Sequence, residues 1–192
     1  MKARLAVFAA MCVALVLSAC GGPTSLKARL STSTDSLTVY ALSGTPPSYP
    51  SGVSLTGRQV VRVDGSGSFD IALDIDSNGN AVIYPVKLVV STPAGARPVG
   101  LQMVAGIFDS VTTAPATGFE SDSVLVLTAG QVVAIQSPHN GSGDICQYAI
   151  SPYLYAKIVV DSVNLTSRTL FVRVGLDPNC GFRSLVDGVP TS

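Results

Sequence analysis

Short apolar runs separated by Gly, Pro, Asn and Ser make up most of the chain beyond its first twenty residues, and no stretch shows an apolar stripe at helical spacing. Eleven of the twelve acidic residues are Asp, which disfavours helices, whereas Val, Ile, Thr and Tyr fill the runs. Eight or nine such strands in about 160 residues predict an all-β fold, an antiparallel two-sheet β-sandwich of immunoglobulin-like architecture. A small β-barrel is the alternative.

The clearest predicted unit is a three-stranded antiparallel meander over residues 58–90. Its first two strands, residues 58–63 and 69–76, are predicted to pair directly across a short Gly-rich turn. Asn78 and Gly79 predict a two-residue type I′ turn between the second strand and the third. This turn sets a register with Ile75 opposite Val82, Leu73 opposite Tyr84 and Ile71 opposite Val86.

Charged residues form a second pattern on the other face of this meander. The same registers place Arg62 and Lys87 opposite Asp70, and Arg58 opposite Asp74. Such neighbours would keep both carboxylates ionised, which disfavours a pair of carboxyl groups working as general acid and base. We therefore expect Asp70 and Asp74 to belong to a surface lattice of ion pairs.

Six further runs have strand character, and they occupy residues 37–42, 101–109, 123–127, 132–136, 153–163 and 168–176. The last two are predicted to form a long hairpin across a three-residue loop at 164–166. Its inner face would pair Ala156 with Val174, Ile158 with Val172 and Val160 with Leu170.

The start of the chain carries a different signal. Two basic residues, Lys2 and Arg4, precede thirteen apolar residues that end at Leu17, and the last of these begins the sequence Leu17-Ser18-Ala19-Cys20. A charged start, a short apolar run and a small-residue junction are the parts of a secretory signal, and the run is too short to span a bilayer.

The junction Leu17-Ser18-Ala19-Cys20 resembles the lipobox of bacterial lipoproteins. The resemblance implies cleavage before Cys20, a diacylglyceryl group on its thiol and an acylated amino terminus. Gly21 follows the cysteine, with no Asp at that place, which favours the outer membrane over the inner one. We expect residues 1–19 to be a cleaved leader, residues 20–35 a lipidated tether, and residues 36–192 a single sandwich domain that faces the periplasm.

Charge and cysteine content narrow the functional classes. Without residues 1–19 the chain has ten basic and twelve acidic side chains, which excludes a basic nucleic-acid binder.

Cys12 leaves with the leader and Cys20 carries the lipid, so Cys146 and Cys180 remain. An even pair in an exported chain predicts a disulfide. One His is too few for a zinc site on these two cysteines.

The preferred place for recognition is the long loop over residues 137–152, because long ordered loops on rigid sheets commonly carry function. His139 is the single His of the chain, and it is expected to be a solvated turn residue. The candidate recognition residues are His139, Asn140, Asp144, Tyr148 and Tyr153. The loop at 110–122 is the second candidate.

A partial match to a calcium loop starts at Asp74, with oxygen side chains at Asp74, Asp76 and Asn78. Its second half fails, since Pro85 stands where the bidentate carboxylate belongs. We therefore expect an Asp-rich hairpin turn without a metal.

Three functional hypotheses remain. The first is a lipid-anchored binding or interaction module of the envelope, with a membrane contact through its lipid, an unidentified ligand or envelope partner, and no cofactor. The second is a hydrolase that uses His139 and Asp144, although the chain has no G-x-S-x-G or S-x-x-K motif. The third is a structural component whose exposed sheet edge pairs with a partner strand.

Overall fold

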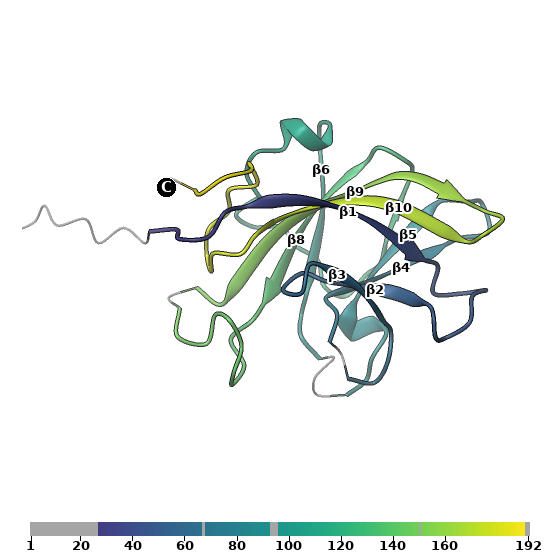
Figure 1. Ribbon diagram of the computed structural model, residues 1–192, viewed down its shortest axis with the longest axis horizontal. Coiled ribbons are helices and arrows are strands. Elements are labelled where there is room, and N and C mark those ends of the chain that lie inside the picture. Colours follow the sequence, from purple (N-terminus) through teal and green to yellow (C-terminus); the bar gives the residue numbers. More distant parts are fainter. Residues whose placement is uncertain (1–26, 67, 93–95, 150, 191–192) are drawn as a thin grey trace, which may run out of the picture.

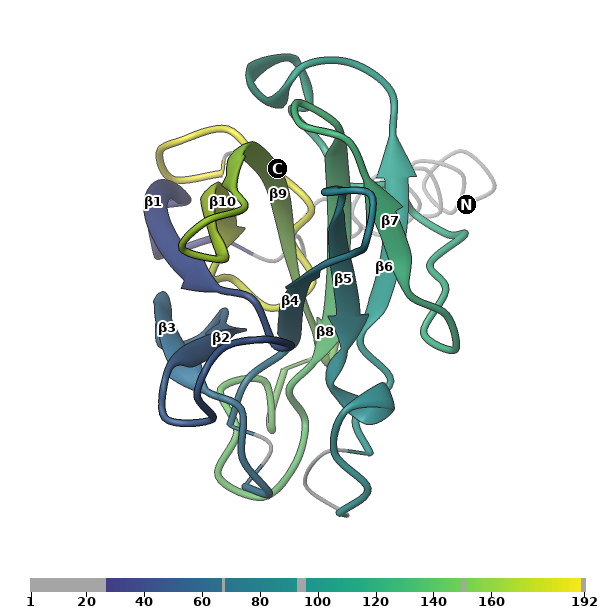
Figure 2. The same cartoon turned by 90° about the vertical axis from the view of Figure 1, so that its right-hand side faces the viewer.

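The protein folds into two antiparallel sheets packed face to face, as a computed structural model shows for residues 27–66, 68–92, 96–149 and 151–190 (Figure 1). The first sheet has the order β1 (Ser33–Tyr40), β10 (Thr169–Asp177), β9 (Tyr153–Asn164), β8 (Val132–Pro138) and β6 (Gly100–Val104). The second has the order β3 (Gln59–Arg62), β2 (Pro50–Ser54), β4 (Ile71–Ile75), β5 (Ala81–Pro85) and β7 (Leu125–Leu127). Figure 2 shows β6 and β7 at one side of the molecule, and β1 and β3 at the other.

The predicted sandwich is confirmed, because the described residues form two separate five-stranded sheets and no closed barrel. Two short 3-10 helices, η1 (Val86–Leu88) and η2 (Phe108–Ser110), are the helical elements of this part of the chain. The predicted leader and Cys20 lie outside the described residues. β1 begins at Ser33, inside the range assigned to the tether.

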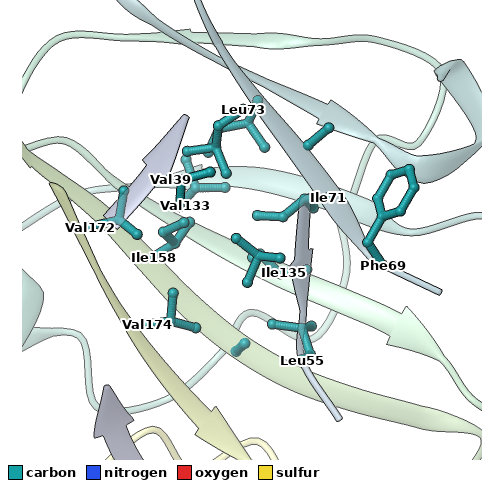
Figure 3. Close-up of a cluster of buried hydrophobic side chains, with 14 of the residues drawn as sticks. Val39, Leu55, Phe69, Ile71, Leu73, Val133, Ile135, Ile158, Val172 and Val174 are labelled. Atoms are coloured by element: carbon teal, nitrogen blue, oxygen red, sulfur yellow. The ribbon is translucent and has the colours of Figure 1, made fainter. Parts of the chain in front are cut away.

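The main core lies between the sheets. Apolar side chains of both sheets point toward one another there, among them Ile71 and Leu73 of β4 opposite Val133, Ile135 and Ile158 (Figure 3). The predicted inner face of the long hairpin is confirmed, since all six of its residues belong to this core: Ala156, Ile158, Val160, Leu170, Val172 and Val174.

The register of that hairpin differs from the prediction. Its turn holds four residues, 165–168, because Asn164 pairs with Thr169 and the Asn164 side chain accepts the N–H groups of Thr166 and Ser167. A bulge between Phe171 and Val172 then leaves the lower part of the hairpin shifted by two residues. A shift of two keeps each side chain on its predicted face.

The register of the β4–β5 hairpin is shifted by one residue. Its loop is Ser77-Asn78-Gly79, because Asp76 pairs with Asn80 through the backbone, and Gly79 has φ +85°. Ile83 therefore pairs with Leu73 and is fully buried in the core, whereas Tyr84 pairs with Ala72 and is only partly buried. The predicted two-residue type I′ turn is wrong, since Gly79 instead closes a three-residue loop.

The predicted direct pairing of residues 58–63 with 69–76 is also wrong. β2 lies between β3 and β4, with Val53 paired to Val60 on one side and to Ile71 on the other. The β2 sequence, PSGVS, combines a Pro, a Gly and two Ser, so its composition indicates a turn. Its backbone pairs, and the packing against β1, decide its place in the sheet.

A second apolar cluster covers the outer face of the first sheet, where η2 and the C-terminal segment lie against Tyr155 and Val159. Lys157 is buried beneath η2, and its Nζ donates to the carbonyl oxygens of Phe108 and Val111, both at 2.8 Å. Removal from water lowers the pKa of Lys157, although the nearby Asp109 and Asp187 oppose this shift. The first sheet is thus covered on both faces.

Candidate functional site

A cleft of about 860 Å³ opens beside the loop that follows β8, and this loop is the one predicted for recognition. Its apolar walls come from Pro98, Pro138, Ile145, Pro152 and Tyr153. The polar lining consists of Thr56, Ser68, Asp70, Arg97, His139, Asn140 and Asp144, with Gly141 and Gly143.

The loop is held at both ends. At its base the His139 N–H donates to the Pro152 carbonyl at 2.7 Å, and the Cys146 N–H donates to the His139 carbonyl at 2.9 Å. The predicted disulfide is confirmed, because Cys146 is bonded to Cys180, and Cys146 itself is buried. The bond fixes the middle of the loop to the segment after β10, so the cleft has a rigid wall.

A buried carboxylate forms the floor of the cleft. Asp70, which is 1% exposed, accepts hydrogen bonds at Oδ1 from Arg97 Nη1 at 2.9 Å and from the Ser137 hydroxyl at 2.5 Å. The ring nitrogen Nε2 of His139 lies 3.1 Å from the same oxygen. The other oxygen, Oδ2, accepts the Leu55 N–H at 2.7 Å. Both oxygens of Asp70 are therefore satisfied by donors.

The charge of Asp70 is compensated where it lies. Burial by itself would raise the pKa of the carboxyl group, but the hydrogen bond from His139, the positive charge of Arg97 and the Ser137 hydroxyl outweigh it and hold the pKa of Asp70 below its ordinary value. Arg97 is fixed in turn, because its Nη2 donates to the Phe69 carbonyl at 2.8 Å. The floor is thus a compensated ion pair.

Ser137, His139 and Asp70 are the three residue types of a hydrolytic triad, but their geometry differs from one. In a triad the two ring nitrogens of the His face different partners, the serine on one side and the carboxylate on the other. Here Nε2 of His139 lies 3.1 Å from Ser137 Oγ and 3.1 Å from Asp70 Oδ1. The Ser137 hydroxyl is fully buried and donates directly to the carboxylate. One ring nitrogen of His139 thus faces both partners, which is not the geometry of a triad.

Four of the five predicted recognition residues line the cleft: His139, Asn140, Asp144 and Tyr153. Tyr148 does not line it, and its side chain is 92% exposed. The expectation of a solvated His139 is wrong, because the residue is 5% exposed. Its carboxylate partner is Asp70, whereas Asp144 accepts the Gly141 N–H at 2.9 Å.

The predicted surface lattice around Asp70 and Asp74 is wrong as well. Both carboxylates are buried, and Asp74 accepts hydrogen bonds from Ser43 and from Arg168 Nη2. The cations assigned to them have other acidic partners: Arg58 pairs with Asp35, and Lys87 pairs with Asp122. The prediction placed no strand between β3 and β4, but β2 lies there. Arg58 and Arg62 are therefore one strand away from the expected carboxylates.

Three residues of the floor were missed as site residues, namely Asp70, Arg97 and Ser137. Arg97 is a single charge in a Pro- and Gly-rich segment, which is a weak signal in a sequence. The three residues are far apart in the chain, so their proximity follows only from the packing of the two sheets.

The residues of the calcium-like segment have protein partners. Asp76 accepts the N–H groups of Asn78 and Asn80, which lowers its pKa and closes the hairpin loop. Asp74 is buried, and it accepts hydrogen bonds from Ser43 and Arg168. Within the described ranges no three His, Cys, Asp or Glu side chains form a group suited to a metal ion.

No protein-family model matches the chain, and no curated protein or solved structure matches it. Among the residues that the structure describes, no helix is long and apolar enough to cross a membrane.

Proposed function

We propose that this chain is a lipid-anchored protein of the bacterial cell envelope whose cleft binds a small ligand. The cleft itself is the observation that carries the proposal: about 860 Å³ with apolar walls and a polar floor is the form that small-molecule sites take. The disulfide-bonded loop beside it supports the same function, because a rigid wall keeps the site formed before the ligand arrives.

The charges of the cleft favour a neutral or cationic ligand. Arg97 is paired with Asp70 at the floor, so it does not offer its full charge to an anion. Asp144 lines the cleft. Its side chain accepts the Gly141 N–H and forms no ion pair among the described residues. An amine on the ligand would form an ion pair with this carboxylate, while the ligand's apolar part would lie on Pro98, Pro152 and Tyr153.

Hydrolysis is the alternative function, and the grouping of Ser137, His139 and Asp70 is the observation in its favour. The buried hydroxyl of Ser137 weighs against it, because a nucleophile must reach the substrate. That hydroxyl already donates its hydrogen bond to Asp70. We therefore favour binding without turnover.

Thermal shift measurements with defined small molecules test the proposal. Amino acids, diamines, amino sugars and short peptides are the probes, because binding to the folded protein raises its melting temperature. We expect an amine-bearing probe to raise it, and we expect Ile145→Trp, which fills the cleft, and Asp144→Asn to abolish the rise. Val126→Trp on β7 is the matched control, since Val126 and Ile145 are each 52% exposed.

Measurements on the same variants can also contradict the proposal. A probe that stabilises wild type and Ile145→Trp equally would place its site elsewhere, and a preference for anionic probes would contradict the role of Asp144. Esterase, phosphatase or glycosidase activity that disappears in His139→Ala would favour the hydrolase. Labelling of the cells with a fatty acid tests the anchor, because the label should be lost in Cys20→Ser.

A further inference from the structure

Three exposed apolar side chains gather where the described chain begins and ends. Leu30, Val186 and Val189 are each 51% exposed. Thr32 and Gly188 bring the two segments together, because each donates its N–H to the carbonyl of the other, at 2.8 and 2.9 Å. We call residues 27–31 and 186–190 the terminal strip.

The terminal strip is held firmly by Asn179. Its Oδ1 accepts the N–H groups of Arg29 and Leu30, at 2.9 and 3.0 Å, and its Nδ2 donates to the Leu30 carbonyl at 2.7 Å. The buried carboxylate of Asp177 orients Asn179 by accepting both its backbone N–H and its Nδ2. The strip is therefore a fixed surface from Arg29 onward.

A lipid surface is the occupant that this position favours. Arg29 is nine residues after Cys20, so even a fully extended chain keeps it within about 30–32 Å of that residue. Lys27 and Arg29 are exposed, and Asp187, the acidic residue of the strip, already accepts a hydrogen bond from Thr34. Basic side chains beside apolar ones suit a membrane that carries anionic headgroups.

We infer that the terminal strip rests on the outer part of a lipid bilayer, with Leu30, Val186 and Val189 in contact with its lipids. The inference rests on the lipid anchor that is part of the proposed function. The strip is also linked to the recognition loop, because Cys180 follows Asn179 directly and is bonded to Cys146 in that loop. Figure 1 shows the first described residues and the C-terminal segment at the left of the molecule, with the loop after β8 below them.

Tryptophan fluorescence tests the contact, because the chain contains no Trp and a single substitution gives the only signal. The full lipidated protein with Val189→Trp is reconstituted into vesicles of phosphatidylethanolamine and phosphatidylglycerol whose acyl chains carry bromine, a short-range quencher. Val186→Trp is a second reporter in the strip. Val126→Trp is the control, because it is equally exposed on β7, away from the strip.

We expect emission from Trp in the two strip variants to shift to the blue and to be strongly quenched, and emission from the control to remain unchanged. Lys27→Glu together with Arg29→Glu should reduce the quenching, and added salt should reduce it too. Protein that floats with the vesicles while both strip reporters stay unquenched would overturn the membrane contact and leave the anchor intact. Protein that is washed off the vesicles would overturn the anchor and, with it, the contact.

Discussion

Replacing Asp70 by Asn tests whether the buried charge holds the floor of the cleft together. The substitution keeps the size of the side chain and removes its charge. The new amide has one NH2 group, and both positions available to it face donors: Arg97, His139 and Ser137 on one side, and the Leu55 N–H on the other. In either orientation the NH2 group of the amide therefore faces another hydrogen-bond donor, and no bond forms there.

The expected loss follows from the burial of the pair. Breaking a buried ion pair costs about 3–5 kcal/mol, because the remaining charge has no partner. The Arg97 side chain is 21% exposed and reaches water, so we expect the lower end, about 3 kcal/mol. For a domain of this size that corresponds to a fall in Tm of roughly 6–12 °C.

The loss should depend on pH in one direction. The folded-state pKa of Asp70 lies below its ordinary value of 3.8. The carboxylate therefore stabilises the fold fully above pH 3.8, and this contribution disappears as the pH falls through the lower, folded-state value. The difference between wild type and Asp70→Asn should shrink as the pH falls below 3.8.

Equilibrium unfolding in urea, measured across this pH range, provides the free energies. Asp161→Asn is the control, because Asp161 is exposed, Arg173 is partly exposed, and their pair should contribute at most about 1 kcal/mol. A loss at Asp70 as small as that at Asp161 would refute the reasoning, and so would a difference that grows as the pH falls below 3.8.

Two further predictions concern the segments that hold the fold around the site. Replacing both Cys146 and Cys180 by Ser should lower the free energy of unfolding by about 3–4 kcal/mol, and wild type in reductant should match the variant; equal stability with and without the bond would contradict this. Lys157→Met should remove the Lys157 donor from the Phe108 and Val111 carbonyls, which leaves Phe108 only the long bond from the Val111 N–H, at a cost of about 1–3 kcal/mol and with faster amide hydrogen exchange around η2. Unchanged exchange there would show that Lys157 does not hold η2.

Side-chain faces were predictable where strands alternate strictly. In the β9–β10 hairpin the predicted inner face is correct although its register is shifted, because a shift of two residues preserves the face. In the β4–β5 hairpin the shift of one residue exchanged Ile83 and Tyr84, and only the loop geometry at Gly79 decides which of them enters the core. Turn length is thus the weak point of the prediction, since Asn-Gly suits more than one loop.

Partners of charged residues were not predictable. Expected pairs came from neighbouring strands of an assumed meander, and the insertion of β2 separated Arg58 and Arg62 from their predicted carboxylates. Asp70 instead finds Arg97, Ser137 and His139, which are 27, 67 and 69 residues away in the chain. Nothing in a local pattern links residues at such distances.

The sequence by itself determined the class of the fold, the disulfide and the loop that carries most of the candidate site, because strand alternation, cysteine pairing and loop length are local or compositional properties. The tertiary structure alone decided that Asp70 and His139 lie buried at the floor of a cleft. Burial of a charge is tolerated only where several donors converge, and here they converge from the end of β8, from the segment before β6 and from the residue after β2. That convergence exists only once the two sheets have packed.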